Sequence, residues 1–366
     1  MPVEFLTADQ RRAYGRFADE FGPKELATRF MLGDKDRGLI SRRRSQQARL
    51  GYGLQVLTVR HLGTFLADPI DVPWRLVEHI ARQLDIADPT VVKSYGEGTI
   101  RFEHQADIAA AYGYADFNAQ PGHFWFLRWL YRRAYMAGER PVVLFDQSRL
   151  HLVDRKVLLP GVTTLERSVA EVRELATIRL WRQLGASVDH AAMADLEALL
   201  VIPPGRRTSR LDQLRRPPAK TTIPGLVAGL RRLEEIRALG VGRLDIGRLP
   251  PGRVEPLARY VLRAKAADLG RMGVERRRAH LVAFAATLDS LAIDDVIDLF
   301  DGVMATMGSA VTRQHRKRRL GTLGDLDSAA LLLRDAWMEL LAAASDPTVD
   351  LRGVIARLEG APVRPR

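Results

Sequence analysis

Arginine and glutamine side chains repeat at helical spacing in the segment "SRRRSQQARLGYGLQVLTVRH", residues 41–61. If this segment is one helix, a single narrow stripe along it contains Arg42, Gln46, Arg49, Gly53 and Arg60. Arginine and glutamine can read base edges in the major groove of DNA, and glycine lets a helix backbone approach closely. A solvated basic face on a core helix would show the same residues. The stripe therefore indicates either a DNA-reading helix or an ordinary charged surface.

Two further clusters of cations follow in the chain. The first lies in the proline-rich segment Ile202–Gly225 and contains Arg206, Arg207, Arg210, Arg215, Arg216 and Lys220. Because prolines interrupt helices, we expect a linker whose cations follow the phosphates of a duplex. The second contains Arg313, His315, Arg316, Lys317, Arg318 and Arg319. For this cluster a solvated loop between two helices is the preferred interpretation.

No motif predicts an enzyme. The sequence has no cysteine, no Gly-Lys-Ser/Thr phosphate loop, no Gly-x-Ser-x-Gly elbow and no His-Glu-x-x-His pair. Asp294, Asp298 and Asp301 share a helical face that could hold a divalent ion. Aspartates also favour a helix N-terminus, and we prefer that interpretation. We therefore expect no catalytic residue, no metal and no cofactor.

Aromatic residues crowd the segment "HFWFLRWLYRRAY", which contains Phe124, Trp125, Phe126, Trp129, Tyr131 and Tyr135. Such rings could stack on bases. Aromatic residues at helical spacing more often fill a core, and we interpret this segment as core.

The composition narrows the class of protein that carries these clusters. The 366 residues include 56 Lys plus Arg against 44 Asp plus Glu, which gives a formal net charge of +12. A strongly basic chain without an apolar membrane-spanning run points first to nucleic acid as its partner. Neither a signal peptide nor a disulfide framework is present, so we expect a cytoplasmic protein without membrane association.

Helical periodicity dominates and predicts an all-α protein with helix-turn-helix-like units. Leu226, Leu230 and Leu233 repeat at helix spacing, and Thr164 is a predicted N-cap of another helix. The best strand candidate, Val142–Phe145, could also be the entry to a helix. Clusters of proline and glycine divide the chain. The predicted parts are a DNA-binding domain at 1–158, a second DNA-binding segment with its linker at 159–218, a helical domain at 219–345 for dimerisation or further DNA contact, and a tail at 346–366.

Several strings resemble Tn-3-family replicative transposases, in chain order. They are "VEFLTADQRRAYGRF" from Val3, "DRGLISRRRSQQARLGYGLQVLTVRHLGTFLADPIDVP" from Asp36, "IRFEHQADIAAAYGYADF" from Ile100, "RKVLLPGVTTLERSVAEVRE" from Arg155, "SRLDQLRR" from Ser209 and "DLDSAALLLRDAW" from Asp325. The resemblance implies helical domains that recognise the terminal inverted repeats of a transposon. In that family an RNase-H-like domain with an Asp-Asp-Glu triad cuts DNA, and no position here matches that triad.

The resemblance also marks the expected DNA contacts. They are Arg42, Arg43, Gln46, Arg49, Arg60, Arg155, Lys156, Thr163, Thr164, Arg206, Arg207, Arg210, Arg215 and Arg216. The expected partners are double-stranded transposon ends and, through a homodimer or a hetero-association, an intact transposase. Such a chain would be a nucleoid-associated bacterial protein that occupies transposon ends without cleaving them.

Two alternatives stay open. The chain could be a subunit or fragment of an active transposase whose Asp-Asp-Glu half is encoded separately. It could also be a helical assembly module without DNA affinity.

Overall fold

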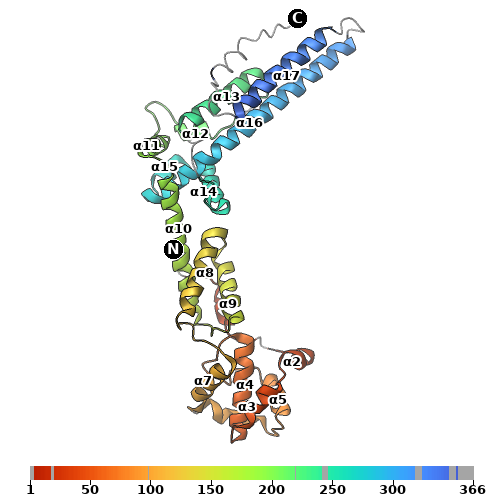
Figure 1. Ribbon diagram of the computed structural model, residues 1–366, viewed down its shortest axis with the longest axis vertical. Helices are drawn as coiled ribbons and strands as arrows, with labels where there is room; N and C mark the ends of the chain where they lie inside the picture. Colours follow the sequence, from red (N-terminus) through yellow and green to blue (C-terminus); the bar gives the residue numbers. More distant parts are fainter. Residues whose placement is uncertain are drawn as a thin grey trace. The chain divides into compact units, whose positions relative to one another are not determined.

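The computed structural model describes residues 4–17, 20–97, 99–218, 220–240, 246–317, 324–345 and 352. These residues contain α-helices, one 3-10 helix and no strand, so the all-α prediction is confirmed (Figure 1). In chain order the elements are α1 (Ala8–Ala13), α2 (Pro23–Arg29), α3 (Asp34–Ser41), α4 (Gln46–Leu62), α5 (Trp74–Gln83), η1 (Pro89–Val92), α6 (Lys93–Glu97), α7 (Ile100–Tyr112), α8 (Gly122–Ala137), α9 (Pro141–Asp154), α10 (Val162–Ala186), α11 (His190–Ala198), α12 (Arg210–Leu214), α13 (Ile223–Ala238), α14 (Pro251–Arg263), α15 (Ala266–Gly270), α16 (Val274–Lys317) and α17 (Gly324–Ser345).

The chain forms two compact units, Met1–Ala176 and Thr177–Arg366. The border lies inside α10, whereas the sequence placed borders near residues 158 and 218. How the predicted segments fold by themselves stays a prediction. No helix in the described ranges combines the length and the apolarity that crossing a bilayer requires.

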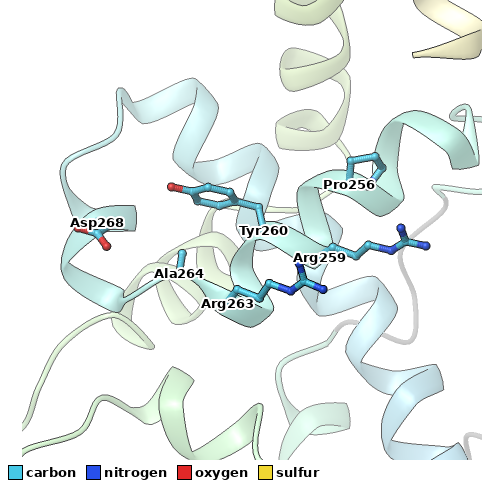
Figure 2. Close-up of a pocket in the computed structure, with 6 residues that line it drawn as sticks. All are labelled: Pro256, Arg259, Tyr260, Arg263, Ala264 and Asp268. Carbon is cyan, nitrogen blue, oxygen red and sulfur yellow. The ribbon is translucent and has the colours of Figure 1, made fainter. Parts of the chain in front are cut away.

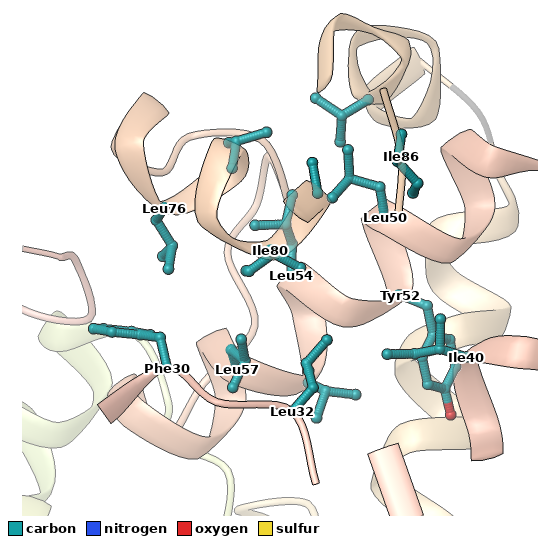
Figure 3. Packing of buried hydrophobic residues seen from close by; sticks show 14 of the residues in the cluster. Phe30, Leu32, Ile40, Leu50, Tyr52, Leu54, Leu57, Leu76, Ile80 and Ile86 are labelled. Carbon is teal, nitrogen blue, oxygen red and sulfur yellow. The ribbon is translucent and has the colours of Figure 1, made fainter. Parts of the chain in front are cut away.

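The first core of unit 1 is built around α4, which is buried along most of its length. Leu50, Leu54 and Leu57 are fully buried and pack with residues of α3 and α5 (Figure 3). A helix that is covered on nearly every side is a core element rather than a surface element. α4 ends at Leu62, and the next residue, Gly63, has a φ of 77° and provides the left-handed C-cap.

The second core of unit 1 joins α8, α9 and the first half of α10 with the N-terminal segment. Phe126 and Leu130 of α8 are buried there, as are Leu144 and Phe145 of α9. The segment proposed as a strand, Val142–Phe145, therefore lies in helix α9, and the helical alternative is confirmed.

A buried carboxylate attaches the N-terminus to this second core. Glu166 of α10 is 1% exposed and accepts hydrogen bonds from the backbone N–H groups of Phe5 and Leu6. The Arg11 guanidinium forms a salt bridge to the same carboxylate at 3.0 Å. A buried carboxylate needs such partners, because an isolated charge in the interior is very unfavourable.

Unit 2 packs around α16, against α11, α13 and α14. Arginines connect these helices: Arg232 of α13 is 8% exposed and contacts Asp295 at 2.7 Å, and Arg277 of α16 contacts Glu197 at 3.1 Å. These two arginines of unit 2 are therefore committed to internal ion pairs.

Candidate nucleic-acid interface

The predicted single helix over residues 41–61 is wrong, because the chain turns between α3 and α4. α3 ends at Ser41, and α4 begins at Gln46 after its N-cap Ser45, whose side chain accepts a hydrogen bond from the Ala48 N–H at 3.2 Å. A serine with extended backbone angles is a strong N-cap, and it starts a new helix here. The stripe expected along one continuous helix therefore does not exist as such.

The glycines of α4 serve helix packing rather than DNA approach. A Cβ atom added at Gly51 would lie 2.3 Å from the ring of Tyr95, and one at Gly53 would lie 3.3 Å from Ile80. Both glycines are buried. The interpretation of Gly53 as a point of close approach for DNA is therefore wrong, since the space that it leaves is filled by the core of unit 1.

The turn between α3 and α4 nevertheless presents a compact group of exposed polar side chains. Arg42, Arg44, Gln46 and Arg49 are all exposed. Arg49 donates from Nε to the carbonyl oxygen of Arg43 at 2.9 Å, which orients its guanidinium. Within the described part of the chain, Arg42 and Arg44 form no ion pair. We call these four residues the α3–α4 turn cluster.

Two members of the predicted set are instead held by acidic residues of unit 1. Arg43 pairs with Asp107 of α7, and its guanidinium lies 4.4 Å from the ring centroid of Tyr52. Arg60 pairs with Asp36 at 2.7 Å. These contacts brace α3, α4 and α7 against one another, and they direct both guanidinium groups toward the protein.

The Asp36 carboxylate is nearly inaccessible and stays charged because it is well supported. Burial alone would raise its pKa, but hydrogen bonds from Arg60, Tyr112 and the Gly33 N–H outweigh that effect, so the pKa lies below its usual value. The hydrogen bond from the Gly33 N–H, at 2.9 Å, also ties this carboxylate to the N-cap residue of α3. The ion pair between Arg60 and Asp36 therefore belongs to the network that holds α3 in place.

A buried polar network lies directly beneath the turn cluster. The Tyr52 hydroxyl donates to Asp107 at 3.1 Å, the Tyr95 hydroxyl contacts His104 Nδ1 at 2.8 Å, and Gln55 Nε2 donates to the Tyr95 oxygen at 2.7 Å. Burial, together with the charge of Arg43, lowers the pKa of His104 to about 4. The network therefore contains an uncharged imidazole at neutral pH, and Asp107, which pairs with Arg43, connects it to the turn.

The second predicted contact region, at the start of α10, is exposed. Arg155, Lys156, Thr163 and Thr164 all lie on the surface. Lys156 has a φ of 52° and donates from Nζ to the Tyr112 carbonyl oxygen at 3.2 Å. α10 begins at Val162, so the prediction of Thr164 as the N-cap is wrong. Thr164 lies inside the first turn of this helix.

The proline-rich segment is not a simple linker, because α12 forms within it. Ser209 is fully buried and exchanges capping hydrogen bonds with Asp212, while Leu211 and Leu214 enter the core of unit 2. Arg215 is also committed, since its Nη1 donates to the carbonyl oxygens of Val261 and Ala264 at 3.2 and 2.5 Å.

The other arginines of this segment differ among themselves. Arg210 pairs with Glu235 at 2.9 Å, whereas Arg206, Arg207 and Arg216 are exposed and show no ion pair among the described residues. The positive surface of the segment is therefore smaller than its sequence indicates.

Two remaining sequence features have clear outcomes. The aspartates expected at a helix N-terminus lie instead in the middle of α16, where Asp295 pairs with Arg232. No cluster of three or more metal-ligating side chains occurs within the described ranges.

The basic cluster that begins at Arg313 is the second feature. The backbone of α16 continues through Lys317, so residues 313–317 are helical rather than a loop. Arg318 and Arg319 lie outside the described residues.

The structure also contains a surface pocket that the sequence patterns did not indicate, and one of its two arginines, Arg259, pairs with Glu255. A cavity of about 510 Å³ on α14 and α15 is lined by Arg259, Tyr260, Arg263 and Asp268, together with Pro256 and Ala264. Figure 2 shows the two arginines projecting from the same side of α14. Their spacing of four residues places them on one helix face and is the signal that could have revealed this site.

Comparison with known proteins gives the chain its relatives. Residues 5–172 match a family described as "Domain of unknown function (DUF4158)". The chain is 40% identical to the transposase for transposon gamma-delta of Escherichia coli K12 over 97% of its length, which covers 35% of that relative. It is 25% identical to the transposase for transposon Tn501 of Pseudomonas aeruginosa over 90% of its length, or 34% of that relative.

The chain thus spans about a third of the length of these curated relatives. The resemblance to transposases drawn from the sequence motifs is confirmed over nearly the whole chain. With its DUF4158 match in the first half, this chain is homologous to the transposases of gamma-delta and Tn501.

Proposed function

We propose that this chain binds the terminal inverted repeats of a transposon as the non-catalytic, N-terminal part of a transposase. The observation that carries the proposal is the 40% identity to a named transposase along 97% of the chain. The net charge of +12 supports it, since a polyanion is the natural partner of such a chain.

The α3–α4 turn cluster is the best candidate for reading bases. Its guanidinium and amide groups can form paired hydrogen bonds with guanine and adenine edges. It lies on a rigid support, because Arg43 and the network around His104 fix the turn from beneath. A base-reading group needs that rigidity, since specificity depends on placing donors and acceptors accurately.

Phosphate contacts would come from cations that have no internal partner in the described structure. Arg155 lies near the start of α10, and Arg206, Arg207 and Arg216 flank α12. Arg263 adds a position on α14. Such contacts give affinity that falls with salt and little discrimination between sequences. Arg215 is not one of these cations, because its guanidinium is bound to the backbone carbonyls of Val261 and Ala264.

Fluorescence anisotropy tests the proposal directly. The full chain is titrated against a labelled duplex with the terminal inverted repeat of transposon gamma-delta and against a scrambled duplex of equal composition. We expect tighter binding to the repeat at every salt concentration. Equal and weak binding to both, lost as salt is raised, would favour an assembly module with merely positive charge.

The variant Arg49→Ala tests the assignment of base reading to the turn cluster. We expect it to reduce the discrimination between the two duplexes by about 1–3 kcal/mol, the usual value of one lost base contact. Arg216→Ala is the matched control and should weaken binding to both duplexes alike. Identical behaviour of the two variants would contradict the division between base and phosphate contacts.

A second candidate function concerns an active transposase assembled from two chains. This chain covers about a third of the length of its transposase relatives, so the activity of a whole transposase would need the remaining part as well. Mixing this chain with the remaining part of such a transposase, and assaying strand cleavage at transposon ends with magnesium, distinguishes the two. Cleavage by the mixture, but by neither part alone, would support assembly of an active transposase from two chains. If this chain instead inhibits an intact transposase, the result would support simple occupancy of the transposon ends.

A further inference from the structure

Helix α8 has a buried face and an unusual outer face. Phe126, Leu130 and Ala134 are buried in the second core of unit 1. The opposite face follows the spacing i, i+3, i+7 and i+11, and carries Trp125, Arg128, Arg132 and Met136, all exposed. The expectation that the whole aromatic segment is core is therefore wrong for part of it.

Two large rings of this segment lie on the surface. Phe124 is 54% exposed and Trp125 is 52% exposed. The rings contact each other edge to face, with centroids 5.3 Å apart. The guanidinium of Arg128 lies 5.5 Å from the Trp125 ring centroid. Paired aromatic rings left in water beside a cation are characteristic of a binding surface rather than of packing.

The charge around these rings selects the kind of partner. The α8 sequence contains Arg128, Arg132 and Arg133 and no acidic residue. Arg133 is held by a two-fold hydrogen bond to Glu139, at 2.8 Å each. Arg128 and Arg132 have no ion pair within the described ranges. An apolar protein groove would favour a continuous apolar stripe, but here the two arginines separate Trp125 from Met136.

We propose that Phe124 and Trp125, together with Arg128 and Arg132, form a second DNA site that binds unstacked bases. The rings would stack on the base faces, and the arginines would contact the adjacent phosphates. Unstacked bases occur in a single strand and in a locally opened duplex, and both present the same chemistry. The inference rests on the proposed DNA binding, but it adds a site that differs from the α3–α4 turn cluster in ligand and mechanism.

The probes are three oligonucleotides that contain 2-aminopurine at the same position. One is a single strand, one is a duplex with a bubble of unpaired bases around the probe, and one is fully paired. Binding of the full chain should change 2-aminopurine fluorescence in the first two probes and hardly at all in the third. A fluorescence change in the single strand alone would identify single-stranded DNA as the ligand of this site. A change in the bubble duplex as well would show that the site also binds bases of an opened duplex.

The variant Trp125→Ala should weaken binding to the single strand and the bubble by about five-fold or more, the usual loss of one base stack. Its affinity for the paired duplex should stay within about two-fold, and its salt dependence should be unchanged, because a ring carries no charge. Trp74→Ala is the matched control, since Trp74 is 44% exposed on α5 of the same unit. It should bind all three probes as the wild type does.

Two further variants keep the proposal falsifiable. Phe124→Ala repeats the test at the neighbouring ring, should Trp125→Ala disturb folding as judged by circular dichroism. Trp125→Leu keeps an apolar surface without a flat ring and should behave as Trp125→Ala does. Wild-type binding by Trp125→Leu would overturn base stacking and indicate an apolar protein contact.

The result is also separable from the proposed function. If the wild type binds the inverted repeat but Trp125→Ala binds all three probes as tightly as the wild type does, only this inference fails. If the wild type binds no duplex at all, the proposed function fails.

Discussion

The two basic segments of this chain, residues 42–49 and 206–216, look alike in the sequence and differ in the folded protein. In the first, Arg42 and Arg44 extend from a turn and form no ion pair in the described structure, while the helix that follows is buried. In the second, Arg210 and Arg215 are bound by Glu235 and by the end of α14. Whether a cation is available depends on acidic and carbonyl groups that lie far away along the chain.

Loss of a committed arginine should cost the most stability, and Arg215 tests this. Arg215→Ala removes two donor contacts to the carbonyls of Val261 and Ala264 and the ion pair with Asp212. We expect the free energy of unfolding to fall by about 2–4 kcal/mol, because partly buried acceptors lose a charged donor. Urea unfolding of unit 2, followed by circular dichroism, measures it. Arg216→Ala is the exposed control and should change stability by less than about 0.5 kcal/mol.

The support beneath the turn cluster should make unit 1 sensitive to mild acid. The pKa of His104 is lowered from 6.5 to about 4 in the folded protein, so the imidazole takes up a proton more readily when unfolded. Stability from the neutral imidazole is then complete above about pH 6.5 and is lost progressively as the pH falls toward 4. We expect a loss of about 2 kcal/mol between pH 7 and pH 5.

The variant His104→Gln is the control for this pH effect. Glutamine retains an acceptor for the Tyr95 hydroxyl but does not titrate, so its unfolding free energy should change less between the two pH values. An equal pH dependence in wild type and variant would show that another group is responsible, and that the turn is supported differently.

The glycines of α4 test whether this helix belongs to the core or to a DNA surface. Gly51→Ala would place a methyl group 2.3 Å from the Tyr95 ring. We expect a destabilisation of about 1–2 kcal/mol, since overpacking outweighs the better helix propensity of alanine. Gly38→Ala, at an exposed position of α3 with open space around it, should be neutral or slightly stabilising. If Gly51→Ala is as stable as the wild type but binds DNA more weakly, α4 would belong to the DNA-binding surface rather than to the core.

The smallest effect concerns an exposed arginine of the turn itself. Arg42→Ala should leave stability unchanged, and the salt dependence of its DNA binding shows which role this member of the turn cluster has: loss of a phosphate contact would reduce the slope of log affinity against log salt by about one. Anisotropy titrations with the inverted-repeat duplex at several salt concentrations measure this slope. An unchanged slope together with lost discrimination would instead assign base reading to Arg42.

The comparison also shows where local patterns were sufficient. Leu226, Leu230 and Leu233 are buried on one face of α13, as their spacing indicated, because helical periodicity depends only on neighbouring residues. The border between the two units was harder to predict from local patterns, because α10 runs through it without a proline or glycine at that point. Breaks in local pattern mark ends of helices, and borders between compact units depend on contacts instead.

The all-α class, the positive charge and the likeness to transposases could be predicted from the amino-acid sequence, because composition, periodicity and ordered motifs are properties of the chain. Which arginines remain available for a partner became clear from the folded structure. It assigned Arg43 and Arg60 to Asp107 and Asp36, and it left Phe124 and Trp125 in solvent although their neighbours are buried. The physical reason is that ion pairing and burial depend on distances in space, and residues far apart in the chain supply both.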